Sequence, residues 1–446
     1  MIDYRPAPVD ENQSLLDKGI ALSHQKAFDQ ALVVFQKVVA IKPDFAVAHY
    51  NIGNTYTYLD KLDEAIASYH KAIQIGGMDE DAALAWYNLG NIYFHKADLP
   101  KSINAYRTAI SINPALAMAY NNLGSVLTEQ PDKPSHREAI KVLENALKLK
   151  ADDIDSLNNL GIAYALLDKA DKAMTFFNKA LKVNPRDTKA YINGAKTLSL
   201  KGQNNKAIAL LNKAVKIAPN DPIAHYNLGC DLSKAGKYDQ AIAAYLKTLQ
   251  LQPDDFNCLY NLAGDYLKTK NYAQAIETYQ KAIKANPAHP SGYFNLAHAF
   301  EQSAERERSP DAYREQLNNA INIYKKAIEI KPDHSDAYYN LSNTYRKQGK
   351  LNEAIKPMET ALLIYQKDRN HFKVAHCCFH LGGIYAGMTQ RKQAVQMHLR
   401  SLKIAKKLKN RGLTAANYSM LIGLYGQLND TKKSRQMAKE FLKLVK

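Results

Sequence analysis

The chain has 446 residues and a formal net charge of +17 at pH 7, with 60 lysines and arginines against 43 aspartates and glutamates. No apolar run approaches the ~18 residues that a membrane span requires, so the sequence predicts no such span. The first residues lack the basic and apolar regions of a secretory signal, and four cysteines in so long a chain cannot build a disulfide framework. We therefore expect a soluble, cytoplasmic protein.

A fixed period divides the chain into similar units. Each period contains an apolar residue followed by Gly or Ala, a small residue twelve positions later, and an aromatic residue or leucine four positions after that. In one unit these are Leu89-Gly90, Ser102 and Tyr106. Such spacings predict two amphipathic helices per unit, joined by tight turns such as Lys201-Gly202 and Gly349-Lys350. Four prolines that close successive units lie 34 residues apart: Pro185, Pro219, Pro253 and Pro287.

This pattern resembles the tetratricopeptide repeat (TPR) family. The resemblance implies an all-α fold, a right-handed superhelical solenoid with a concave groove lined by the first helix of each unit. The same spacing gives about twelve units, ten in residues 12–365 and two looser ones in residues 366–446. The clearest single match consists of Trp86, Leu89, Gly90, Tyr93, Ser102, Tyr106, Ala109 and Pro114.

One slot in the first helix carries asparagine in nine consecutive units. An amide has donors and an acceptor, so it can pair with the N–H and C=O groups of an extended peptide. The row is similar to that lining the superhelix of the O-linked N-acetylglucosamine transferases, and this likeness implies peptide binding along the groove. Asparagine is also common at this slot across the family, so the row could be family consensus alone. The nine residues are Asn51, Asn88, Asn122, Asn159, Asn193, Asn227, Asn261, Asn295 and Asn340.

The residues that precede these asparagines indicate the chemistry of the groove. Other repeats of the family clamp a C-terminal carboxylate with lysine and arginine around such asparagines. Here the preceding slots are largely aromatic, which favours apolar and stacking contacts. The aromatic members are Tyr50, Tyr87, Tyr226, Tyr260, Phe294 and Tyr339.

One unit is eleven residues longer than the others, between Phe300 and Ala320. Eleven residues make about three helical turns, so lengthened helices can keep their core face in phase. Ser309-Pro310 would then begin the second helix. The insertion is either a partner contact or a tolerated surface addition, and we favour the latter.

Motifs for catalysis are missing from the sequence. We find no phosphate loop, dinucleotide fingerprint or nucleophile elbow, and we predict neither enzymatic activity nor a cofactor. His376 and His380 have a helical spacing that can bind Zn²⁺, but two ligands do not make a site, so no metal is expected.

Positive charge is concentrated at the C-terminal end. Residues 361–446 hold 17 lysines and arginines but 3 acids, which gives this segment a net charge of +14. It is either an electrostatic dock for an acidic partner or a solubilising cap of the array. Nucleic acid is the less expected partner, because the basic helices contain few aromatic residues for stacking. Two stripes at helical spacing form the candidate dock: Arg400, Lys403, Lys407 and Arg411, and then Lys432, Arg435, Lys439, Lys443 and Lys446.

Two functions remain open at this point. The first is a protein-protein interaction scaffold or adaptor that binds extended peptide segments in the groove. The alternative is a polyanion-binding protein that acts through the basic C-terminal units, with an acidic protein, a nucleic acid or an anionic surface as the partner.

Overall fold

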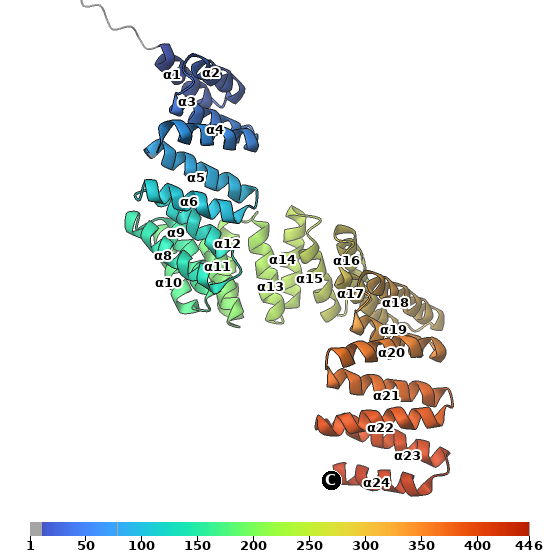
Figure 1. Cartoon of the computed structure of the whole chain (residues 1–446). Coiled ribbons are helices and arrows are strands. Elements are labelled where there is room, and N and C mark those ends of the chain that lie inside the picture. The colour runs from blue at the N-terminus through green and yellow to red at the C-terminus, as the bar shows by residue number, and fades with distance from the viewer. Residues whose placement is uncertain (1–10, 78, 446) are drawn as a thin grey trace, which may run out of the picture. The chain divides into compact units, whose positions relative to one another are not determined.

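The computed structural model describes residues 11–77 and 79–445, and within them every regular element is an α-helix (Figure 1). There are 24 such helices, and successive helices pack in pairs as hairpins, α1 with α2 through α23 with α24. This confirms the predicted all-α solenoid of twelve helix-turn-helix units.

The helices form two compact units, and the first of them ends at Pro219. The division at residue 365 that the sequence suggests rests on the looser repeat pattern and the positive charge of residues 366–446, and it stays a prediction. The helices of the first unit are α1 (Glu11–His24), α2 (Phe28–Ile41), α3 (Ala46–Tyr58), α4 (Leu62–Gly76), α5 (Glu80–His95), α6 (Leu99–Ile112), α7 (Ala117–Thr128), α8 (Lys133–Leu149), α9 (Ile154–Leu166), α10 (Ala170–Val183), α11 (Thr188–Leu200) and α12 (Asn204–Ile217).

The second unit begins at Asn220. Its helices are α13 (Pro222–Lys234), α14 (Tyr238–Leu251), α15 (Phe256–Lys268), α16 (Tyr272–Ala285), α17 (Pro290–Ala304), α18 (Pro310–Ile330), α19 (Ser335–Lys347), α20 (Leu351–Lys367), α21 (His371–Gly387), α22 (Arg391–Lys407), α23 (Arg411–Gln427) and α24 (Thr431–Val445).

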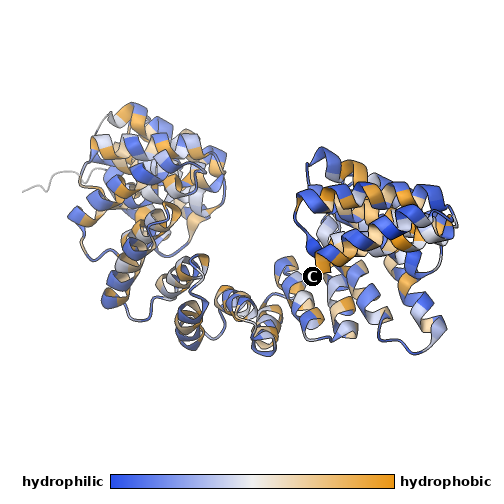
Figure 2. Cartoon of the chain, turned by 90° about the horizontal axis from the view of Figure 1, so that it is seen from below, coloured by the Kyte–Doolittle hydropathy of each residue, from blue (hydrophilic) through white to orange (hydrophobic). Residues whose placement is uncertain are grey.

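In many hairpins the core joins a small residue on the first helix to a large one on the second. A Cβ atom added to Gly90 would lie 2.5 Å from the ring of Tyr106, which is 1% exposed. Gly161 and Phe177 make the same contact. The glycine lets the two helices approach, and the ring fills the space between them. Most helices carry hydrophobic residues beside hydrophilic ones, as this one-sided packing requires (Figure 2).

Tight turns separate the helices of each hairpin. Gly202 and Gly349 have φ angles of 72° and 77°, in the left-handed region that glycine adopts without steric cost. Both are turns that the sequence predicts.

The long unit is built as the sequence predicts. Helix α18 begins at Pro310, and the hydroxyl of Ser309 caps it by accepting a hydrogen bond from the N–H of Ala312. It has 21 residues, whereas α16 has 14. The added residues are therefore 310–316, at the start of the helix, and Leu317, which follows them at the usual first position of a second helix, is fully buried. The eleven extra residues therefore lengthen the hairpin without displacing its packing.

Candidate functional site

The nine predicted asparagines occupy equivalent positions on the first helices of consecutive hairpins, and we call them the asparagine ladder. Each side chain is partly buried. Their helices are α3, α5, α7, α9, α11, α13, α15, α17 and α19.

In the first unit, ladder amides join neighbouring first helices by donating hydrogen bonds. The Nδ2 of Asn88 on α5 donates to the hydroxyl of Tyr50 at 3.3 Å and to Oδ1 of Asn54 at 3.0 Å, both on α3. Asn122 on α7 repeats the arrangement, with bonds of 3.2 Å to Tyr87 and 2.9 Å to Asn91. Both N–H donors of these two amides are therefore used inside the protein.

The second unit shows the same bond to the preceding aromatic slot. Asn261 donates to the hydroxyl of Tyr226 at 3.2 Å, and Asn295 donates to that of Tyr260 at 2.6 Å. These tyrosines were expected to offer their rings to a ligand. Their hydroxyls instead accept from the next rung of the ladder, a pairing between hairpins that the sequence alone does not reveal.

The remaining rungs differ in their partners. Asn159 donates to Oδ1 of Asn121 at 2.9 Å, and Asn340 donates to the hydroxyl of Tyr324 at 3.3 Å. Asn51 and Asn227 each donate to a backbone carbonyl one turn earlier in their own helix, at 2.8 Å. Within the described part of the chain, the side chain of Asn193 makes no hydrogen bond.

The carbonyl oxygens of the ladder are less engaged than its amide nitrogens. Among the residues that the structure describes, Oδ1 of Asn88, Asn261 and Asn295 accepts no hydrogen bond and is not enclosed without a partner, so water reaches it. The sequence led us to expect both donors and acceptors in the groove. At these rungs each amide nitrogen donates at least one hydrogen bond within the protein, while the carbonyl oxygen stays open.

Two clefts have ladder residues in their walls. One, of about 400 Å³, is lined by Asn261 and Asn295 together with the tyrosines Tyr245, Tyr260 and Tyr279, and we call it the Asn261 cleft. A second, of about 390 Å³, lies in the first unit at Asn51. Its wall includes the rings of Phe28 and Tyr58, which stack with centroids 4.7 Å apart.

A carboxyl group that the sequence did not single out also lines the Asn261 cleft. Asp265 is 4% exposed, and its Oδ1 accepts a hydrogen bond of 2.6 Å from the hydroxyl of Ser233. Its Oδ2 is buried with no partner among the described residues, and burial raises the pKa of the group. The cleft thus combines ladder amides, tyrosine rings and one desolvated carboxyl group.

The basic residues near the C-terminus are placed differently from the two stripes expected. All eight within the described range are exposed, while Lys446 lies outside it. Arg411 does not continue the stripe of Arg400, Lys403 and Lys407, because α22 ends at Lys407 and Arg411 begins α23. The prediction of one four-residue stripe was therefore wrong. The second stripe does lie on a single helix, α24, with Lys432, Arg435, Lys439 and Lys443.

Few of these cations have acidic partners. Lys443 pairs with Glu440 at 2.9 Å, and Arg411 donates to the backbone carbonyl of Leu444 at 2.6 Å. Arg400, Lys403, Lys407, Lys432, Arg435 and Lys439 form no ion pair within the described residues.

The predicted histidine pair lies on α21. His380 directly precedes Leu381-Gly382, so it occupies the ladder slot of the eleventh hairpin. Burial lowers its pKa to about 4, helped by the positive charge of Arg346. In residues 11–77 and 79–445 no group of three or more His, Cys, Asp or Glu side chains could hold a metal ion. No helix in the same residues is both long and apolar enough to cross a membrane.

Part of this chain is similar in sequence to a known protein. Mouse protein O-mannosyl-transferase TMTC3 is 40% identical over 63 residues, which are 14% of this chain and 7% of that protein. The chain thus matches only a small part of this curated relative's length.

Solved structures also match in part. YrrB, described as a TPR protein with an unusual peptide-binding site, is 24% identical with a TM-score of 0.34 and covers 42% of this chain and 95% of its own. A tetratricopeptide repeat protein from Parabacteroides merdae is 17% identical with a TM-score of 0.47, covering 56% and 97%. MamA from Desulfovibrio magneticus is 25% identical with a TM-score of 0.35, covering 39% and 96%.

Family models match the repeats themselves. Models described as tetratricopeptide repeat match residues 46–76, 154–187, 226–290, 260–317 and 333–407. A model described as TPR repeat matches residues 90–130, 195–230 and 311–349. Together the matches cover most of the chain, and the chain belongs to the tetratricopeptide repeat family.

Proposed function

We propose that this protein is a non-enzymatic scaffold or adaptor that binds extended peptide segments of its partners along the asparagine ladder. The observation that carries the proposal is the Asn261 cleft, where two ladder residues and three tyrosines share one wall. Repeat proteins of this family bind protein or peptide partners, and the cleft offers a surface of suitable chemistry.

The chemistry of the ladder favours recognition of a peptide backbone. The amide nitrogens of Asn261 and Asn295 are held by tyrosine hydroxyls, which orients each side chain and leaves its oxygen open. An open carbonyl oxygen accepts a hydrogen bond from a backbone N–H whatever the side chain of that residue. The tyrosine rings add apolar contact area. Such a surface selects extended chains more strongly than particular sequences.

The experiment removes two ladder oxygens at once. An array of unstructured 15-residue peptides is screened with the full chain, and the affinity of the strongest binder is measured by fluorescence anisotropy. We expect Asn261→Ala combined with Asn295→Ala to weaken binding about tenfold or more, because two hydrogen bonds are lost. Gln240→Ala is the matched control, since Gln240 is an exposed amide on α14 outside the cleft.

Tyr260→Phe separates ligand contact from internal support. It removes the hydroxyl that accepts from Asn295 but leaves both ladder oxygens in place. We expect it to weaken peptide binding less than the double asparagine variant does. An unchanged affinity in the double variant, with helicity intact, would show that the ladder is family consensus and not a binding surface.

A second candidate function is docking of an acidic partner at the basic C-terminal helices. The observation that favours it is the set of exposed cations on α22 and α24 that form no ion pair within the described residues. Such a surface attracts anions over ~8 Å at physiological salt, and the attraction weakens as salt rises. Retention on a heparin column measures it, and the triple variant Arg400→Gln, Lys403→Gln and Lys407→Gln should elute at lower salt. Unchanged elution would favour a solubilising cap.

The expected cytoplasmic location belongs to the same proposal. It is supported by the state of the cysteines, since Cys230, Cys258, Cys377 and Cys378 are all free thiols.

A further inference from the structure

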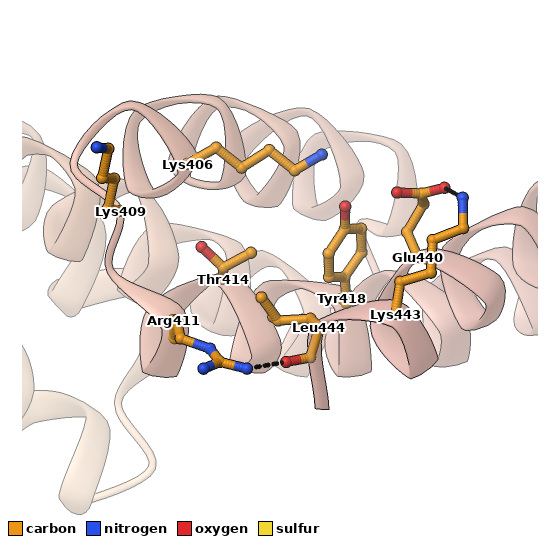
Figure 3. Close-up of a pocket in the computed structure, with 8 residues that line it drawn as sticks. All are labelled: Lys406, Lys409, Arg411, Thr414, Tyr418, Glu440, Lys443 and Leu444. Atoms are coloured by element: carbon orange, nitrogen blue, oxygen red, sulfur yellow. Dashed lines mark hydrogen bonds and ion pairs between the residues drawn. The ribbon is translucent and has the colours of Figure 1, made fainter. Parts of the chain in front are cut away.

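A cleft of about 300 Å³ lies where α22, α23 and α24 meet, and we call it the basic cleft (Figure 3). It gathers side chains from three elements that the sequence separates. Only two of its residues belong to the predicted stripes, because those stripes follow one helix at a time. The lining residues are Lys406, Lys409, Arg411, Thr414, Tyr418, Glu440, Lys443 and Leu444.

The charge of the basic cleft is strongly positive. Lys406 and Lys409 come from the end of α22 and the turn after it, Arg411 begins α23, and Lys443 lies on α24. Glu440 is the one acid among the lining residues, and it pairs with Lys443 at 2.9 Å. The hydrogen bond from Lys443 is the main cause that lowers the pKa of Glu440, so the carboxylate stays ionised at neutral pH. Four cations against one anion leave an excess of three positive charges.

Arg411 is held in position by the end of α24. One guanidinium nitrogen, Nη2, donates a hydrogen bond of 2.6 Å to the backbone carbonyl of Leu444 (Figure 3). A guanidinium carries five N–H donors in a planar fork, so several remain for an anion. Anchoring by a neutral carbonyl fixes the group without neutralising its charge.

Tyr418 supplies an unused hydroxyl inside the basic cleft. Its side chain is 2% exposed, and its ring lies 5.2 Å from Nζ of Lys406. Within residues 11–77 and 79–445, its hydroxyl makes no hydrogen bond and is not enclosed away from the cleft. In Figure 3 the hydroxyl points from α23 toward the side of the cleft formed by Lys406. A buried side chain with an open donor is a feature that a bound acceptor would complete.

We propose that the basic cleft binds the phosphate group of a phosphorylated serine or threonine on a protein partner. A phosphate ester carries close to two negative charges and three acceptor oxygens at neutral pH, whereas a carboxylate carries one charge and two oxygens. The arginine fork, the lysines and the tyrosine hydroxyl supply the positive charge and the hydrogen-bond donors that a phosphate group needs. The volume lies at the lower end of small-ligand sites, about 300–1,000 Å³, which suits one such group.

This inference rests on the second proposed function, because it names the group that the basic C-terminal helices would recognise. It differs from that function in being local. An electrostatic dock depends on total charge and tolerates the loss of any one residue, whereas the basic cleft depends on Arg411 and on a hydroxyl that carries no charge at all.

The experiment titrates the full chain with a seven-residue peptide of glycine and alanine around one phosphoserine. The unphosphorylated peptide and a glutamate version serve as ligand controls. We expect binding of the phosphopeptide alone, weakened about tenfold by Tyr418→Phe and at least tenfold by Arg411→Gln, since each removes a hydrogen bond to a charged group. Tyr418→Phe keeps the buried ring, and circular dichroism checks that both variants remain folded.

Matched control variants test whether position or charge is recognised. Tyr425→Phe alters a buried tyrosine of the same helix that does not line the basic cleft. The triple variant of Arg400, Lys403 and Lys407 removes three charges outside the cleft. We expect both to bind the phosphopeptide like the parent, while the triple variant alone loses a large part of its retention on heparin. The failure of one proposal is thereby distinguishable from the failure of the other.

Three results would overturn the inference. Equal phosphopeptide affinity in the parent, Arg411→Gln and Tyr418→Phe would show that the basic cleft is not the site. Binding of inorganic phosphate without binding of the phosphopeptide would assign the cleft to a free anion. Binding only to vesicles that contain a phosphatidylinositol phosphate would assign it to a lipid headgroup.

Discussion

Single residues set how closely the two helices of each hairpin approach, and the glycines of the first helices show this most directly. Gly90→Ala would place a methyl group 2.5 Å from the ring of Tyr106, which is fully enclosed and cannot move aside. Overpacking of this kind costs about 1–3 kcal/mol of unfolding free energy. Urea denaturation followed by circular dichroism measures the loss.

Gly383 is the control for that substitution. It also lies in a first helix, α21, but a Cβ atom there would meet nothing within 4 Å. Alanine is the better helix former, so Gly383→Ala should be neutral or stabilising by up to about 1 kcal/mol. A similar loss in both variants would mean that glycine is required by the helix backbone and not by the aromatic residue opposite.

At the scale of single residues, the sequence could predict which residues form the asparagine ladder but not which hydrogen bonds they make. Its nine asparagines were identifiable from spacing alone, since a shared slot puts them at equivalent places on the first helices. The direction of their hydrogen bonds was not, because Asn295 bonds to Tyr260, which lies 35 residues away on the neighbouring hairpin. This contact depends on how neighbouring hairpins pack, which no local sequence pattern encodes. His380 was overlooked as a ladder position because it is not an asparagine.

At the scale of the element, the long hairpin α17–α18 is held by a buried carboxylate. Glu301 on α17 is 5% exposed and accepts hydrogen bonds from the hydroxyls of Tyr324 on α18, at 2.6 Å, and Thr344 on α19, at 2.8 Å. Burial raises the pKa of the group, but these bonds, the contact with the imidazole of His298 and the positive charge of Lys347 outweigh it and lower the pKa. One side chain thus joins three helices.

Glu301→Gln tests this junction. The amide keeps the shape of the side chain but loses the charge and one acceptor, so we expect a loss of about 1.5–3 kcal/mol in unfolding free energy. Glu305→Gln is the control, because its ion pair with Lys347 is exposed and contributes at most about 1 kcal/mol. Chemical denaturation of both variants gives the comparison. Equal stabilities would show that the junction is held by apolar packing alone.

The sequence predicted the length of this hairpin but not its chemistry. An insertion of eleven residues fits three helical turns, which placed the start of α18 at Pro310. Glu301, by contrast, opens a charged run and reads as a surface residue. Its burial follows from the packing of α19 against the hairpin, which brings Thr344 to it from 43 residues away.

At the scale of the whole molecule, the count of twelve hairpins could be read from the period, because each hairpin packs mainly on its neighbours. The boundary between the two compact units, after Pro219, could not be read from the period, since the period continues through that point without a change. Nor could the basic cleft, which forms where three helices converge.

The whole chain should also lose stability in mild acid, and the loss should begin in the last hairpins. Burial lowers the pKa of His376, His380 and His398, which lie on α21 and α22. The helices that carry these histidines are already rich in positive charge, so protonation of each histidine is further disfavoured. Helices α9 to α12 contain no histidine and provide an internal reference.

The direction of this pH dependence follows from the number of protons that the folded and unfolded states bind. The unfolded chain protonates a histidine near pH 6.5, whereas folded His380 does so near pH 4, so between these values the unfolded state binds more protons and stability falls as pH falls. The shift corresponds to at most about 3 kcal/mol for this residue. His380→Asn restores the residue of the other ladder slots and removes the effect. Hydrogen exchange at pH 7.5 and pH 5, corrected for intrinsic rates, should show α21–α24 opening in the parent more than in the variant, while α9–α12 stay protected in both. If the variant opens as readily as the parent at pH 5, His380 is not the source of the acid sensitivity.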